Sequence, residues 1–180
     1  MTTLAASSVQ EVSTIESHMI PNDSIVVFDW DNTLKIVNKE TKRIESRVNK
    51  EFLRHLIGER GCELYVISAI RPSQMNMDTL LMEVDRLGLR NFFCQNSKGR
   101  EKGANDFPWV REGNIIICGY NKAEVFLTLR EKDMSCTDEV DCADDGHLTK
   151  RPVVFFDDEA ENIEKFSHIV KDSLCYKIEG

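Results

Sequence analysis

The chain has 180 residues, of which 41% are hydrophobic and 30% charged, a composition typical of one globular domain and not of a disordered chain or a repeat array. Asp and Glu together number 31 against 23 Lys and Arg, so the formal net charge is -8 at pH 7. An acidic chain repels nucleic-acid backbones and anionic membrane surfaces, and we therefore expect neither as a partner.

The cysteines and the N-terminal segment bear on the cellular compartment. No CxxC pair and no Cys/His cluster with zinc spacing occurs. Cys136 and Cys142 lie in an acidic stretch and could pair, although nothing in the sequence requires a disulfide. The first twenty residues lack the basic and apolar regions of a signal peptide, and no apolar run is long enough to cross a bilayer. These features predict a soluble, cytoplasmic protein.

Residues 1–20 are rich in Ser and Thr, and we expect a partly ordered lead-in with room for a short helix, followed by one domain over residues 21–180. Within that domain, short apolar runs alternate with segments of helical spacing. In chain order, the sequence predicts a strand at 24–28, a hairpin at 35–45, a helix at 49–58, a strand at 63–67, a helix at 72–88, strands at 92–94 and 114–118, a helix at 122–130, a strand at 153–156, a helix at 159–170 and a strand at 174–178. Polar loops are expected at 95–112 and 133–150.

This alternation predicts an α/β fold, a Rossmann-like, doubly wound and mainly parallel sheet with helices on both faces. Right-handed crossovers place the carboxyl ends of such strands along one edge of the sheet. Ligands of these folds bind at that edge, so polar residues that directly follow a strand are the candidates for function.

Polar side chains of a particular kind follow four of the predicted strands. They are Asp29, Asp31 and Thr33 after 24–28, Ser68 after 63–67, Lys122 after 114–118, and Asp157 and Asp158 after 153–156. A buried group of carboxylates cannot stay charged without a cation, and carboxylate oxygens suit Mg²⁺. A hard cation, a Lys and a Ser hydroxyl together predict a site for a doubly negative phosphoryl group.

These residues resemble, in order, the four motifs of the haloacid dehalogenase (HAD) superfamily, and the chain looks like a small capless phosphatase of that group. Asp29-Trp30-Asp31-Asn32-Thr33 resembles the first motif, DxDxT. Ser68 resembles the second motif, Lys122 the third and Phe156-Asp157-Asp158 the fourth. The segment 156–163, including its Asn162, is also similar to the fourth-motif segment of small HAD phosphatases. The resemblance spans residues 25–178.

The resemblance implies a phosphomonoester hydrolase with a covalent intermediate. Asp29 would be the nucleophile that attacks phosphorus and forms an aspartyl-phosphate. Asp31 would be the general acid and base, which protonates the leaving alcohol and later deprotonates the attacking water. By the same resemblance, dehalogenases lack an acid at the position of Asp31 and transport ATPases carry Thr there, so this residue fits a phosphatase or a phosphomutase.

The resemblance also implies Mg²⁺ as the cofactor. Its ligands would be a carboxylate oxygen of Asp29, the backbone carbonyl of Asp31 and the carboxylate of Asp157. Asp158 would bind the metal through water, and Asn162 would lie just outside the ligands.

On the phosphate side, Ser68 would hydrogen-bond a phosphoryl oxygen, and Lys122 would neutralise charge and orient the nucleophile. Thr33, grouped with these two, would support the loop.

Some relatives carry a large cap domain, but here the predicted core elements fill the intervals from Thr33 to Ser68 and from Ser68 to Lys122. We therefore expect no large cap and an open site. The expected substrate is a phosphorylated one that can reach such a site, a phosphotyrosine-like phosphoprotein first and a small phosphomonoester as the alternative. The hairpin 35–45 or the loop 95–112 could act as a partial lid. A module that binds phosphate or a partner without catalysis is the competing function.

The sequence leaves the roles of three further features open. Trp30, between the two aspartates, could line the substrate entrance or pack within the loop. Arg71 could contact phosphate or be a surface residue. The acidic run 138–145 lacks the spacing of a calcium-binding loop and is most simply a solvated loop.

Overall fold

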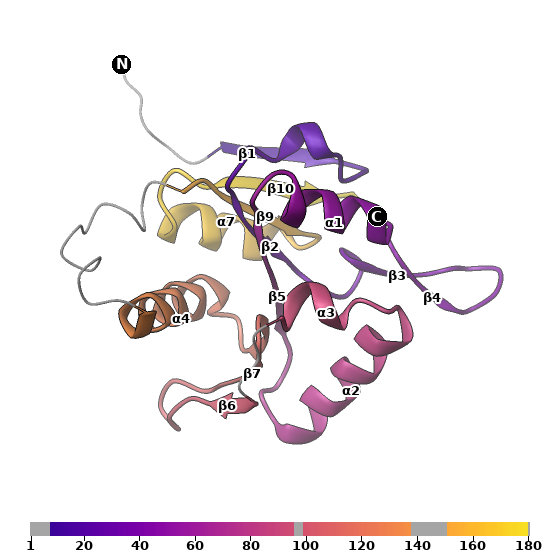
Figure 1. The fold of residues 1–180 in the computed structure, drawn as a ribbon. Helices are drawn as coiled ribbons and strands as arrows, with labels where there is room; N and C mark the ends of the chain where they lie inside the picture. The colour runs from indigo at the N-terminus through magenta and orange to yellow at the C-terminus, as the bar shows by residue number, and fades with distance from the viewer. Residues whose placement is uncertain (1–7, 96–98, 138–150, 180) are drawn as a thin grey trace, which may run out of the picture.

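The computed structural model describes residues 8–95, 99–137 and 151–179, except for the side chains of residues 8 and 135–137. It confirms a mixed α/β fold whose main sheet is mostly parallel (Figure 1). Within the described residues the sheet has eight strands. In spatial order they are β1 (Ser8–Val12), β10 (Leu174–Ile178), β9 (Val153–Asp157), β2 (Ile25–Phe28), β5 (Glu63–Ala69), β8 (Ile115–Cys118), β7 (Trp109–Glu112) and β6 (Arg100–Lys102).

The strands from β1 to β8 in this order all pair in parallel, whereas β7 and β6 are antiparallel additions at one edge. At the centre of the sheet, Ile25 of β2 pairs with Val153 of β9 on one side and with Glu63 of β5 on the other. The carboxyl ends of β2, β5, β8 and β9 therefore meet at the same edge. The strands β3 (Lys35–Val37) and β4 (Ile44–Ser46) form the expected hairpin, separate from this sheet.

The helices that pack on the sheet begin and end close to the predicted positions, with one exception in length. They are α1 (Lys50–Gly58), α2 (Gln74–Arg86), α4 (Lys122–Thr137) and α7 (Ala160–Ile169). Asn49 and Ser73 cap the first two, since their side chains accept hydrogen bonds from the backbone N–H groups of Phe52 and Asn76. Helix α4 is longer than predicted and runs into the segment expected to be a loop from residue 133.

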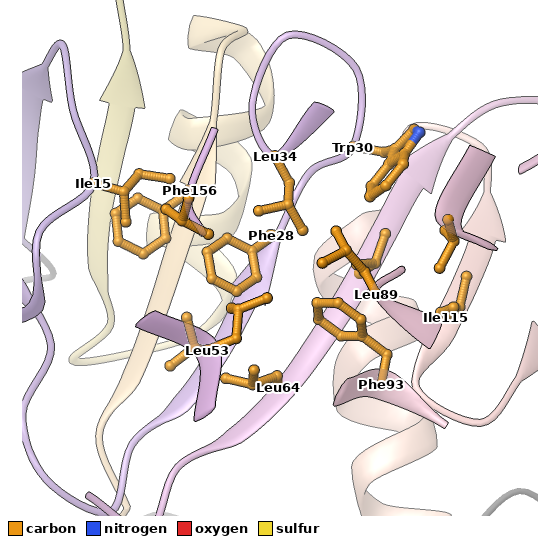
Figure 2. Close-up of a cluster of buried hydrophobic side chains, with 14 of the residues drawn as sticks. Ile15, Phe28, Trp30, Leu34, Leu53, Leu64, Leu89, Phe93, Ile115 and Phe156 are labelled. Carbon is orange, nitrogen blue, oxygen red and sulfur yellow. The ribbon is translucent and has the colours of Figure 1, made fainter. Parts of the chain in front are cut away.

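Two hydrophobic cores lie on opposite faces of the sheet, because successive residues of a strand point to opposite sides. Phe28 and Val66 belong to the core beneath α1 and α2, whereas Val27 and Tyr65 belong to the core beneath α4 and α7. In the first core, drawn in Figure 2, the rings of Phe28 and Phe156 stack with their centroids 5.5 Å apart. Each such fully buried side chain stabilises the fold by roughly 1.5–3 kcal/mol.

The strand predicted at 92–94 is wrong, because Phe92 and Phe93 belong to a short helix and Cys94 caps its end. The helix α3 (Arg90–Phe93) makes one turn and buries the ring of Phe93 in the first core. Arg90 fixes it by pairing with Asp85 at 2.8 Å and with Glu112 at 2.7 Å. Three apolar residues are too few for their spacing to distinguish a strand from a helical turn.

The loop predicted at 95–112 is also wrong, since its described part contains the antiparallel strands β6 and β7. Trp109 and Val110 are buried, and β7 pairs with β8. The segment looked like a loop because of its charged residues, but the guanidinium of Arg111 is buried and lies 2.9 Å from Asp133. Because Arg111 forms an ion pair within the fold, its charge can be buried, whereas the sequence pattern predicted a solvent-exposed side chain.

Part of the expected lead-in belongs to the main sheet. Strand β1 pairs in parallel with β10, an element that the sequence did not predict, and a short 3₁₀ helix (Ser17–Met19) follows it. The thiols of Cys62, Cys94, Cys118 and Cys175 are free. The side chain of Cys136 and all of Cys142, like the acidic run 138–145, lie outside what the structure describes. No helix in the described ranges has the length and apolar composition needed to span a bilayer.

Candidate active site

A pocket of about 110 Å³ opens at the carboxyl edge of the sheet, where β2, β5, β8 and β9 end. Its wall is formed by Asp29, Asp31, Asn32, Ser68, Ala69, Ile70, Tyr120, Asp157, Asp158, Glu159 and Asn162. The structure therefore brings six of the sequence-predicted site residues to a single pocket. Two others, Thr33 and Lys122, lie behind the wall and contact it.

Lys122 is buried at the start of α4 and joins two of the carboxylates. Its Nζ lies 2.7 Å from Oδ1 of Asp29 and 2.7 Å from Oδ2 of Asp157. Burial alone would lower the pKa of Lys122, but the two carboxylates outweigh burial and hold the pKa above its ordinary value. The ammonium is therefore a fixed positive charge beside Asp29.

The pKa of Asp29 is raised to about 7. The largest cause is burial, which penalises the charged carboxylate; Lys122 opposes this effect, and the nearby Asp157 adds to it. Two buried carboxylates thus compete for one ammonium. A further positive charge at this position would restore the ionised form of Asp29, which a nucleophile requires.

Three carboxylates could hold a metal ion here. Oxygen atoms of Asp29, Asp157 and Asp158 all lie within 4.8 Å of one another. Asp157 is fully buried, and its Oδ1 also accepts a hydrogen bond of 2.9 Å from the backbone N–H of Glu159, which fixes its orientation. The donor set is all oxygen and exceeds the charge of Lys122, so it fits a hard divalent cation such as Mg²⁺.

The loop that follows β2 is held by its own backbone and by Thr33. The buried hydroxyl of Thr33 donates a 3.0 Å hydrogen bond to Oδ2 of Asp29. Asn32 has a φ of 64°, a left-handed conformation that Asn tolerates better than most residues. The guanidinium of Arg47 donates to the backbone carbonyls of Asn32 and Thr33. The contact from Thr33 fixes Oδ2 of Asp29, as Lys122 fixes Oδ1, and the contacts from Arg47 hold the backbone of the loop in place.

Asp31 lies in the pocket wall but outside the carboxylate group around Asp29. Its Oδ1 is 2.7 Å from Nζ of Lys35, and its side chain is 54% exposed. Its expected metal contact is through the backbone carbonyl and stays a prediction. Ser68 is buried in the last part of β5, and Asn162 lies in the first turn of α7.

The structure resolves two of the alternatives. Trp30 is fully buried and donates a 2.8 Å hydrogen bond from Nε1 to Glu83, so it packs beneath the loop and does not line the entrance. Arg71 is exposed and takes no part in the pocket wall. The hairpin 35–45 and the described part of 95–112 do not contribute to the wall either.

Sequence reasoning missed several residues of the site. Lys35 follows Asp31 by four positions, and this spacing was a usable signal for an ion pair. Tyr120 follows the predicted strand 114–118 by two positions, and this place after a strand end was also a usable signal. Glu83 and Arg47 gave no such signal, because only the packing of the chain brings them to the site. Tyr120 is 66% exposed and stands in the pocket wall, and Nζ of Lys165 lies 6.0 Å from its ring centroid.

Comparison of the chain with models of known protein families, with curated proteins and with solved structures gave no match. The chemistry of the pocket and the motifs that build it are therefore the grounds for a function.

Proposed function

We propose that the chain is a Mg²⁺-dependent phosphomonoester hydrolase of the HAD superfamily, in which Asp29 accepts the phosphoryl group. The observation that carries this proposal is the buried Asp29, paired with Lys122 and adjacent to Asp157 and Asp158 in an open pocket. A doubly wound sheet without a large cap domain is part of the same proposal. Its support is the spacing of the motifs and a described pocket wall built from the ends of sheet strands and the segments that follow them.

The carboxylates of Asp29 and Asp157 and the backbone carbonyl of Asp31 would hold the metal, with Asp158 close by. Bound Mg²⁺ would supply positive charge that favours ionised Asp29 and offsets the charge of the phosphate. Lys122 supplies a second, permanent positive charge on the same carboxylate. Ser68 would donate a hydrogen bond to a phosphoryl oxygen from its buried position in the wall.

In the first half-reaction, a carboxylate oxygen of Asp29 attacks phosphorus while the bond between phosphorus and the leaving oxygen breaks. Asp31 gives its proton to the leaving oxygen, so an alcohol departs. In the second half-reaction, water attacks the phosphorus of the aspartyl-phosphate and passes a proton to Asp31, while the bond between phosphorus and the oxygen of Asp29 breaks. Phosphate is released, and both aspartates return to their starting states. Lys122 and Thr33 each hold one oxygen of Asp29, which keeps the carboxylate oriented for in-line attack.

An accessible phosphate is the proposed substrate, a phosphotyrosine-like side chain of a protein first and a small phosphomonoester second. Tyr120 supports the aromatic choice, because its exposed ring stands in the pocket wall where the group bearing the phosphate would lie. The carboxylates of the wall, including Glu159, disfavour a polyanion such as a nucleic acid.

The experiment is release of phosphate from para-nitrophenyl phosphate, with Mg²⁺ and with a chelator, by the wild type and by Asp29→Asn. We expect the chelator to abolish release and Asp29→Asn to lower it by roughly a thousandfold or more, as expected when a nucleophile is lost. A wild type that releases no phosphate with any divalent metal, yet binds inorganic phosphate, would be the non-catalytic module instead. Phosphotyrosine peptides, phosphoserine peptides and small phosphates then rank the substrates.

A further inference from the structure

We propose that Lys35 is a positioning residue for Asp31, and that Glu83 of α2 anchors this lysine, so that the acid–base carboxylate is fixed in the pocket wall. The proposal rests on the proposed function, in which Asp31 exchanges a proton with the leaving group. It adds two residues that none of the HAD-like motifs contains.

The contacts of Lys35 carry the proposal. Its Nζ lies 2.7 Å from Oδ1 of Asp31 and 3.3 Å from each carboxylate oxygen of Glu83. The lysine side chain is 13% exposed, whereas Asp31 is 54% exposed. The largely buried ammonium of Lys35 is held in place between two carboxylates. It therefore restricts the rotamers of Asp31, the more exposed of these two partners.

A residue of the hydrophobic core holds the side chain of Glu83 in place. Its Oε1 accepts the 2.8 Å hydrogen bond from Nε1 of Trp30, and it stands on α2, whose apolar face packs in the same core. Trp30 is 1% exposed and lies in the cluster drawn in Figure 2. A continuous series of contacts therefore runs from the buried indole through Glu83 and Lys35 to Asp31.

Asp31 needs such support because it lies on a loop and is half-exposed. A general acid must lie within hydrogen-bonding distance of the leaving oxygen, and a free side chain spends much of its time in other rotamers. Lys35 binds Oδ1, and the contacts of the described residues leave Oδ2 for the proton exchange. Because Asp31 is half-exposed, its contact with Lys35 adds little to stability, and we expect the loss of this contact to affect catalysis more than folding.

The test uses the full chain with Mg²⁺ and three substrates of decreasing leaving-group ability: para-nitrophenyl phosphate, phenyl phosphate and glycerol phosphate. Lys35→Met should lower kcat by roughly 10- to 100-fold on glycerol phosphate and by less than about threefold on para-nitrophenyl phosphate, because a good leaving group needs no proton. KM should change by less than about twofold if substrate binding is untouched. Lys35→Arg, which keeps the cation, should recover part of the loss.

Lys39→Met is the matched control, since Lys39 is an exposed lysine on the same hairpin, and it should behave as the wild type on all three substrates. The Asp31→Asn background supplies the decisive comparison. In the absence of the Asp31 carboxylate, Lys35→Met should lower kcat little further, as expected for two residues that act as one unit. A full additional loss in that background, or an equal loss on all three substrates, would overturn the positioning role.

If Lys35→Met fails to fold, Glu83→Gln takes its place, because it loosens the anchor and leaves Lys35 and an acceptor for Trp30. A loss selective for the poor leaving group supports the proposal, and a uniform loss overturns it. The outcome is separable from the proposed function. Full activity of Asp29→Asn would refute the phosphatase mechanism itself, whereas an inactive Asp29→Asn together with a Lys35 variant that is uniformly affected would refute the positioning role alone.

Discussion

Asp29 and Asp157 share the ammonium of Lys122 in a buried setting, so the negative charges there outnumber the positive ones. Such an imbalance costs free energy in the folded state, because a buried carboxylate without a full partner loses its hydration. In the proposed enzyme, bound Mg²⁺ would offset this cost. The same residues that prepare the nucleophile therefore make the metal-free protein sensitive to pH.

We predict that the metal-free protein becomes less stable as pH rises from about 4 to 7. The folded chain keeps a proton on Asp29 up to a pKa of about 7, whereas the unfolded chain releases it near the ordinary pKa of 3.8. The unfolded state binds fewer protons over this range, so the free energy of unfolding falls as pH rises, on the scale of about 1.4 kcal/mol per pKa unit. Urea unfolding at several pH values measures the fall.

Asp29→Asn is the control for this prediction, because it removes the titrating carboxyl and leaves every other charged side chain in place. The variant should lose the part of the slope that belongs to Asp29. Mg²⁺ should flatten the wild-type curve, since a bound cation favours ionised Asp29. Identical slopes for the wild type and the variant would contradict the raised pKa.

At the scale of elements, the loop after β2 depends on a residue that lies outside the motifs. Arg47, between β4 and α1, donates hydrogen bonds to the carbonyls of Asn32 and Thr33, and its Nη1 lies 3.4 Å from the carbonyl of Ser13. A guanidinium can serve several carbonyls in fixed directions, which a lysine cannot. Arg47 therefore ties the loop to the segment that follows β1.

We predict that Arg47→Ala destabilises the protein by about 1–3 kcal/mol, through unpaired carbonyls. It should also lower kcat by roughly 10- to 100-fold, because small displacements of a catalytic group are costly. Arg47→Lys should fall between the wild type and the alanine variant. Urea unfolding and phosphate release measure the two effects, and wild-type values of both in Arg47→Ala would refute this role.

The structure confirms the five predicted strands of the parallel sheet, which are short runs of mainly apolar residues, and the one at 174–178 matches β10 residue for residue. Such runs can be buried only between layers of helices. The sequence pattern did not predict β7, because the charge of Arg111 is paired within the fold. It predicted a strand where α3 lies, because the apolar run at 92–94 is too short to distinguish the two. It also missed β1, a short strand whose place is given by its pairing with β10.

At the scale of the whole molecule, the parallel order of the strands brings the residues of the candidate site together at one edge of the sheet. Residues at or just after the carboxyl ends of β2, β8 and β9 are far apart in the sequence, yet Lys122 contacts Asp29 from 93 positions away and Asp157 from 35. The sequence could predict this meeting, because every one of these residues adjoins a strand end. It could not predict that Lys35 meets Glu83, 48 positions away, since that contact depends on how α2 packs against the hairpin.

The most direct measurement is to trap the covalent intermediate. The full chain is mixed with Mg²⁺ and para-nitrophenyl phosphate, treated with borohydride, which reduces an aspartyl-phosphate to homoserine, and its peptides are examined by mass spectrometry. We expect homoserine at position 29 in the wild type, none without substrate and none in Asp29→Asn. Turnover of the substrate with residue 29 unmodified, or with homoserine at another aspartate, would contradict Asp29 as the group that accepts phosphate.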